Sequence, residues 1–288
     1  MFSGTATALI TPFRKDGSID EECLRRIVEF QEENGVTAMV PCGSTGESAT
    51  MSHDEHIEVI KIVVDHVKKA KVIAGAGSNS TSEAITLSKK AQDIGADAVL
   101  SISPYYNKPT QEGIFQHYKA VSESIKIPLI MYNVPGRTGS NISPETTLRL
   151  AELGNIIATK EASGNIDQIQ TILAERPKGF LVLSGDDNLT YPMMTLGSEG
   201  TISVASNCFP REVSDMVGLC RSGNYDEARK IHMRMLPLFR ALFLESNPIP
   251  VKYIMKKMGF GTGTLRLPLT ELSDVNKKTV DAILKNLR

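Results

Sequence analysis

Short apolar runs alternate with longer amphipathic stretches along most of this chain, and this alternation restricts its fold more than any other feature. The amphipathic stretches have helical periodicity, so the apolar runs between them read as buried strands. Strands that are separated by helices pair in parallel, and eight such strands can close into a barrel. We expect the eight strands at Ala6–Ile10, Ala38–Pro41, Val72–Ala74, Ala98–Ile102, Leu129–Tyr132, Ile156–Lys160, Phe180–Leu183 and Thr201–Val204.

Helix signals agree with this division of the chain. Ser52-x-x-Glu55 and Ser80-x-x-Glu83 have the pattern of capping boxes, and Gly35 and Gly95 stand where helices end. From about Pro210 the pattern is helical only, over Arg211–Arg221, Asp226–Leu244, Val251–Met258 and Leu272–Leu287. The sequence therefore predicts a (β/α)8 TIM barrel over residues 1–224, followed by a C-terminal helical domain over residues 225–288. A doubly wound open sheet is the alternative.

Charge and composition exclude several classes of partner. The 32 Lys and Arg residues nearly balance the 33 Asp and Glu residues, so no overall field favours nucleic acid or a membrane surface. No apolar run is long enough to span a bilayer, and the N-terminal segment lacks the basic start of a signal peptide. The four cysteines lie far apart in the sequence, which is typical of a reduced, cytoplasmic protein.

Reactive side chains gather where the predicted strands end. Lys160 closes the sixth run, while Tyr132 and Arg137 follow the fifth. The carboxyl ends of barrel strands meet at one mouth, so an amine, a phenol and a guanidinium are expected together there. They could form a Schiff base, move protons and hold a carboxylate. The alternatives are a lysine that extends into water, a tyrosine that plugs a strand end and an ordinary loop arginine.

Two further motifs do not support cofactor or metal binding. Gly75-Ala-Gly-Ser-Asn-Ser80 follows a strand and opens a helix, but it lacks the third glycine of a dinucleotide-binding loop. His53-Asp-Glu-His56 places two imidazoles on one helical face without matching a zinc-binding motif. We therefore expect neither a metal nor an organic cofactor.

Five motifs, spread over almost the whole chain, resemble one enzyme family. They are Gly43-Ser-Thr-Gly-Glu47, Tyr132-Asn-Val-Pro135, Lys160-Glu-Ala-Ser-Gly164, Asn247-Pro-Ile-Pro-Val-Lys252 and Leu265-Arg-Leu-Pro268. The sequence resembles the dihydrodipicolinate synthases, which belong to the N-acetylneuraminate lyase superfamily of class I aldolases. The resemblance implies a lyase that condenses pyruvate with L-aspartate 4-semialdehyde in diaminopimelate and lysine biosynthesis. The alternatives are an N-acetylneuraminate or 2-keto-3-deoxy sugar-acid lyase of the superfamily, or a barrel that binds a keto acid without turnover.

The resemblance also implies a role for each site residue. Lys160 would form the imine with pyruvate, and Tyr132 would be the general acid and base beside it. Tyr106, reaching in from a neighbouring subunit, and Ser44 would complete a proton relay, although the family usually has threonine where this chain has Ser44. The remaining roles are substrate binding: the pyruvate carboxylate at Thr45, the aldehyde's carboxylate at Arg137, and backbone carbonyls at Gly185 and Ile202.

Assembly and regulation are the last implications of the resemblance. A homotetramer built as a dimer of dimers is expected, because Tyr106 would have to cross a subunit interface. L-Lysine is the expected feedback inhibitor, in a cleft formed by Ser48, Ala49, His53, His56, Asn79, Glu83 and Tyr105. The alternative is that the two histidines are only solvated residues of their helix and that Glu83 caps its own helix.

Overall fold

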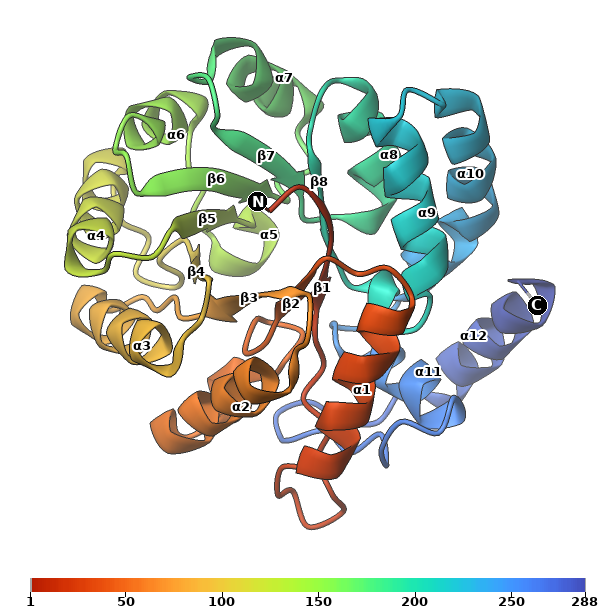
Figure 1. Ribbon diagram of the computed structural model, residues 1–288. Coiled ribbons are helices and arrows are strands. Elements are labelled where there is room, and N and C mark those ends of the chain that lie inside the picture. Colours follow the sequence, from red (N-terminus) through yellow and green to blue (C-terminus); the bar gives the residue numbers. More distant parts are fainter. Residues whose placement is uncertain (1, 288) are drawn as a thin grey trace.

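Eight parallel strands form a closed barrel at the centre of the computed structural model, which describes residues 2–287 (Figure 1). Each strand pairs with the next in sequence, and β8 returns to pair with β1. The (β/α)8 prediction is therefore confirmed and the open sheet was wrong. The strands are β1 (Gly4–Ala8), β2 (Ala38–Val40), β3 (Lys71–Gly75), β4 (Ala98–Ile102), β5 (Leu129–Asn133), β6 (Ile156–Glu161), β7 (Leu181–Ser184) and β8 (Gly200–Ser203).

Helices surround the barrel, as Figure 1 shows. They are α1 (Glu21–Glu33), α2 (His53–His66), α3 (Thr81–Ile94), α4 (Gln111–Ser124), α5 (Pro135–Thr138), α6 (Pro144–Ala151), α7 (Ile166–Glu175), α8 (Asp187–Thr195) and α9 (Pro210–Arg221). Two short 3-10 helices, η1 (Ser48–Thr50) and η2 (Ala205–Asn207), follow the ends of β2 and β8.

Three more helices form the C-terminal extension: α10 (Tyr225–Ala241), α11 (Ile249–Lys257) and α12 (Asp274–Leu287). Helix α10 packs against α8 and α9, and α11 contacts η2 and α12. The extension thus lies directly against the barrel, and its division from the barrel as a separate domain at residue 225 stays a prediction. None of the helices in residues 2–287 has the length and apolar character needed to cross a membrane.

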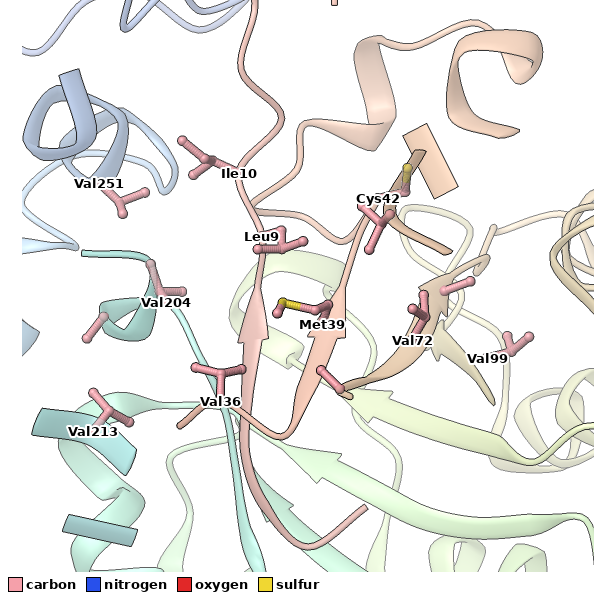
Figure 2. Close-up of a cluster of buried hydrophobic side chains, with 14 of the residues drawn as sticks. Leu9, Ile10, Val36, Met39, Cys42, Val72, Val99, Val204, Val213 and Val251 are labelled. Atoms are coloured by element: carbon pink, nitrogen blue, oxygen red, sulfur yellow. The ribbon is translucent and has the colours of Figure 1, made fainter. Parts of the chain in front are cut away.

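Apolar side chains fill two layers. An inner layer inside the barrel includes Ile130 and Leu183, and an outer layer lies between the strands and the helices. Figure 2 shows part of the outer layer, with Met39 from β2, Val213 from α9 and Val251 from α11. Successive strand residues alternate between the layers. The four cysteines are all free and buried.

Two local predictions were wrong. Strand β1 begins at Gly4, two residues before the predicted start, because Gly4 and Gly200 allow β1 and β8 to approach closely enough to pair. Glycines are usually read as strand breakers, so this pairing could not be predicted from the local sequence. Ser80 precedes α3 but makes no capping hydrogen bond with its side chain. Its supposed partner Glu83 instead binds the hydroxyl of Ser78 and the imidazole of His53.

Candidate active site

Lys160 and Tyr132 face each other inside the barrel. They are register partners on β6 and β5, and both belong to the strand positions that point inward. The Lys160 Nζ lies 4.1 Å from the centroid of the Tyr132 ring, and both residues are buried. The predicted meeting of an amine and a phenol is thus found in the structure.

Burial decides the protonation of both groups. Burial, helped by Arg137, lowers the pKa of Lys160 from 10.5 to a net value of about 7, although Asp187 and Asp186 oppose the shift. A substantial fraction of the amine is therefore uncharged near neutral pH and able to attack a carbonyl. Burial raises the pKa of Tyr132 to about 12, so its phenol keeps its proton.

The residues that follow Tyr132 and Lys160 connect β5 and β6 by hydrogen bonds on the outer side of the barrel. Asn133 and Glu161 are the next register partners, and both are fully buried. The Asn133 Nδ2 donates to the two Glu161 carboxylate oxygens at 3.3 and 3.1 Å. Glu161 also accepts from the Ser163 N–H at 2.7 Å and from Gln168 at 3.3 Å. A hydrogen-bonded network of this kind holds the ends of β5 and β6, and with them Tyr132 and Lys160, in one register.

A cavity of about 100 Å³ opens at Lys160. Four of the predicted residues line it with Lys160 and Tyr132: Ser44, Thr45, Arg137 and Gly185. Ile202 does not; it is buried in the inner apolar layer on β8. Asp186, Phe243 and Asn247, to which the sequence analysis assigned no role, also line the cavity. Asp186 directly follows Gly185, and burial raises the pKa of its carboxyl to about 6.

Gly185 is needed where it stands because a side chain there would meet the lysine. A Cβ added at Gly185 would lie 2.9 Å from the Lys160 Cε and 2.9 Å from the Ala162 Cβ. Distances this short require one of the groups to move. Gly185 therefore leaves the space through which the Lys160 side chain extends.

Asn247, from the segment before α11, joins two of the predicted binding residues. Its Nδ2 donates to the Thr45 Oγ1 at 2.9 Å, and its carbonyl accepts from the Arg137 guanidinium at 3.0 Å. The motif Asn247-Pro-Ile-Pro marked this segment as a family feature. No local pattern could indicate its contact with Thr45, which is 202 positions away in sequence.

A second cavity, of about 500 Å³, adjoins the first, and Ser44, Tyr132 and Arg137 line both. It contains six of the seven residues predicted to bind lysine: Ser48, Ala49, His53, His56, Glu83 and Tyr105. Asn79 does not line this cavity but donates to the Tyr105 carbonyl at 3.2 Å. The structure thus brings all seven residues to one region.

The two histidines of this region have different surroundings. His53 is exposed and pairs with Glu83 at 2.6 Å. His56 is buried and bonds the Gly75 carbonyl at 2.6 Å, and burial lowers its pKa. Glu83 is therefore bound by other side chains and does not cap its own helix.

Tyr106 does not enter the cavity of its own chain. Its side chain is 88% exposed, and its φ of +73° is unusual for a residue with a side chain. Its backbone N–H donates to the Thr138 carbonyl at 3.1 Å, which ties the tyrosine loop to α5, the helix that carries Arg137. The adjacent Tyr105 faces the second cavity, so the two tyrosines serve different surroundings.

The glycines of the Gly75–Ser80 motif have a packing role. Side chains at Gly75 and Gly77 would collide with the backbone of Cys42 and Ile102, so these glycines allow close packing of neighbouring segments. Within residues 2–287, no group of three or more His, Cys, Asp or Glu side chains is arranged to hold a metal ion.

Comparison with known proteins gives a consistent result. The Dihydrodipicolinate synthetase family model matches residues 1–287. A 4-hydroxy-tetrahydrodipicolinate synthase of Chloroherpeton thalassium is 53% identical over 287 residues, which cover 99% of this chain and 95% of that protein.

Solved structures agree. The chloride-inhibited dihydrodipicolinate synthase of Acinetobacter baumannii, complexed with pyruvate, is 42% identical with a TM-score of 0.98, covering 100% of this chain and 99% of that one. The enzyme from Cyanidioschyzon merolae with lysine bound is 41% identical with a TM-score of 0.97, covering 99% and 98%.

Proposed function

This chain belongs to the dihydrodipicolinate synthetase family, and we propose that it makes 4-hydroxy-tetrahydrodipicolinate by condensing pyruvate with L-aspartate 4-semialdehyde on Lys160. The observation that carries the proposal is the buried Lys160 amine, whose pKa is lowered to about 7 and which lies against the Tyr132 ring. An amine in this state is the nucleophile that a class I aldolase requires.

The reaction begins with imine formation. The uncharged Lys160 Nζ attacks the ketone carbon of pyruvate, and the resulting carbinolamine loses its hydroxyl as water after accepting a proton from Tyr132. Thr45 binds the pyruvate carboxylate, and its hydroxyl is held in place by Asn247. Loss of a methyl proton from the iminium then gives an enamine, with the nitrogen acting as the electron sink.

Carbon–carbon bond formation follows. Arg137 binds the carboxylate of the semialdehyde, since a guanidinium pairs well with a planar anion. The enamine carbon attacks the aldehyde carbon, and the aldehyde oxygen takes a proton to become the 4-hydroxyl. The substrate amino group then attacks the imine carbon and displaces Lys160, which closes the ring and returns the enzyme to its starting state. One water leaves for each product formed.

Protons pass through Tyr132, which we propose to be connected to Ser44 and to Tyr106 of a neighbouring subunit. Ser44 lines both cavities beside Tyr132 and keeps the hydroxyl of the usual threonine, but it lacks the methyl group that restricts side-chain rotation. Gly185 and Ile202 contribute backbone carbonyls. A homotetramer of paired dimers supplies the interface.

Trapping the imine tests the central step. The protein is incubated with pyruvate and borohydride, digested, and the reduced adduct is mapped by mass spectrometry. We expect the adduct on Lys160 in the wild type and none in Lys160→Ala. Wild-type protein without an adduct would contradict every aldolase mechanism for this chain. Faster cleavage of N-acetylneuraminate or a keto-deoxy sugar acid than consumption of the semialdehyde would instead indicate another aldolase of the superfamily.

Subunit complementation tests the role of Tyr106. Tyr106→Phe and Lys160→Ala are each expected to lower activity strongly when assayed alone. A mixed dimer contains one site with an intact Lys160 from one subunit and an intact Tyr106 from the other. Exchanging subunits of the two variants should therefore restore part of the activity. No recovery after demonstrated exchange would show that Tyr106 does not act across an interface.

We also propose that the second cavity binds L-lysine as a feedback inhibitor. Polar groups in and beside this cavity suit a free amino acid: the Glu83 carboxylate for an ammonium, Tyr105 and the neighbouring Asn79 for a carboxylate, and an imidazole near the side-chain amine. The two cavities share Ser44 and Tyr132, which gives a direct contact path to the proton relay. The lysine-bound relative supports the choice of ligand.

Calorimetry and rate measurements test the lysine proposal. Millimolar L-lysine should lower the rate and release or absorb heat on binding, with a coupling of about 1–3 kcal/mol between the sites. Glu83→Ala and His56→Ala should weaken both effects. An unchanged rate without binding heat would exclude lysine as an inhibitor, and inhibition that survives both substitutions would place its site elsewhere.

A further inference from the structure

An ion pair that the proposed reaction does not use lies buried between the C-terminal extension and the barrel. The Lys252 Nζ, on α11, donates to the Glu47 carboxylate and to the Thr264 carbonyl at 2.8 Å. The two side chains are 2% and 0% exposed, and the Nζ lies 4.2 Å from the centroid of the Phe13 ring. The hydration that two charges lose on burial offsets much of their mutual attraction, so stability alone is a weak reason for such a pair.

Glu47 ends the turn that carries two of the site residues. The Gly46 N–H donates to the Gly43 carbonyl at 3.0 Å, and the Glu47 N–H donates to the Ser44 carbonyl at 3.2 Å. Glu47 has a φ of +57°, a left-handed conformation that is unfavourable for a residue with a side chain. The end of the turn is thus held in an unfavourable conformation, and something outside the turn must hold it there.

The contacts of the Glu47 carboxylate supply that restraint. One oxygen accepts from Lys252, and the other accepts from the Arg266 backbone N–H at 3.1 Å. Arg266 is itself fixed, because its guanidinium pairs with Glu55 and donates to the Gly17 carbonyl at 2.7 Å. Both oxygens are therefore bound by groups of the C-terminal extension.

The same extension contacts the turn a second time, two residues earlier. Asn247, which precedes α11, donates to the Thr45 hydroxyl at 2.9 Å. Thr45 and Glu47 are thus attached to Asn247, two residues before α11, and to Lys252 within it. A segment that binds a short turn at two points restrains both the position and the orientation of the turn.

We infer that Lys252 is a positioning residue: through Glu47 it holds the turn Gly43–Glu47 so that Thr45 can bind the carboxylate of the keto acid. This inference rests on the proposed function. It assigns a role in catalysis to the C-terminal extension, because the barrel alone leaves the Glu47 side chain without its cationic partner.

Substitution of Lys252 by Met tests the inference. Methionine keeps the length and helical preference of lysine but removes the charge. We expect the KM for pyruvate to rise about 10- to 100-fold and imine trapping to slow, as misplaced binding groups do. The KM for the semialdehyde should change little, since Arg137 binds it. The matched control is Lys257→Met on the same helix, which removes a partly exposed pair with Asp281 and should leave both KM values unchanged.

A double variant, Glu47→Gln with Lys252→Met, separates positioning from stability. It leaves no buried charge without a partner, so it should regain much of the stability lost in Lys252→Met, as measured by urea unfolding. A pyruvate KM that stays raised in the stable double variant supports the inference. If Lys252→Met alone does not fold, the double variant is compared with the wild type instead. Recovery of the pyruvate KM together with stability would overturn it, as would an unchanged pyruvate KM in either folded variant. Failure of the wild type to form an adduct with pyruvate would refute the proposed function separately.

Discussion

Replacing Lys160 with Met is expected to stabilise the folded protein while it abolishes imine formation. Burial lowers the pKa of Lys160 from 10.5 to about 7, and each pKa unit corresponds to about 1.36 kcal/mol. Holding the ammonium in the barrel therefore costs on the order of 5 kcal/mol at low pH. The attraction of Asp186 and Asp187 is already included in this pKa shift. Repacking around the methionine reduces the gain, so we expect a net stabilisation of roughly 2–4 kcal/mol.

The pH dependence of this gain identifies its cause. Between about pH 7 and 10.5 the unfolded state binds more protons at Lys160 than the folded state does, so wild-type stability rises with pH in this window. The advantage of Lys160→Met should be largest below pH 7 and shrink toward pH 10.5.

Urea unfolding near pH 6 and pH 9.5 at equal protomer concentration measures the difference, with Lys61→Met as a control for an exposed lysine. Equal stability of variant and wild type near pH 6, or a gain that does not vary with pH, would refute the reasoning.

Three further predictions concern activity. The rate of imine formation with pyruvate should rise with pH through an apparent pKa of about 7 as Lys160 loses its proton, and rapid borohydride quenching at several pH values would reveal a flat profile if this is wrong. Gly185→Ala should slow imine trapping at least about tenfold by displacing the Lys160 side chain, with a loss of about 1–3 kcal/mol in unfolding free energy; unaltered trapping kinetics would contradict this. Arg137→Ala should raise the KM for the semialdehyde by roughly 30- to 1,000-fold, equivalent to about 2–4 kcal/mol, while adduct formation with pyruvate persists; loss of the adduct would assign Arg137 to pyruvate instead.

Periodicity in the sequence predicted the barrel because each strand has a local signature. Apolar runs mark the strands, and strict alternation of side chains then decides which residues point inward. Lys160 and Tyr132 could be placed together on these grounds, since both end a strand of the same barrel. Gly4 could not be assigned to β1, because the close pairing with Gly200 that makes it a strand residue is a tertiary contact.

The contacts that could not be predicted from the sequence share a physical cause. Asn247 contacts Thr45 across 202 positions, and Lys252 contacts Glu47 across 205, so no local pattern encodes either contact. Ser80 had the sequence of a capping box, yet Glu83 binds Ser78 and His53, because tertiary partners competed with the local one. Sequence therefore identified the groups that do chemistry more readily than the groups that hold them in place.

The properties that make Lys160 reactive also require a rigid surrounding. A buried amine gains by moving toward water, so the fold must resist that movement without restoring full solvation. The network of Asn133 and Glu161 supplies this resistance on the outer side of β5 and β6, where it cannot hydrogen-bond the amine itself. Gly185 leaves space for the Lys160 side chain on the inner side. Reactivity at Lys160 thus depends on the strand register, which the buried Asn133 and Glu161 maintain, and on the absence of a side chain at Gly185.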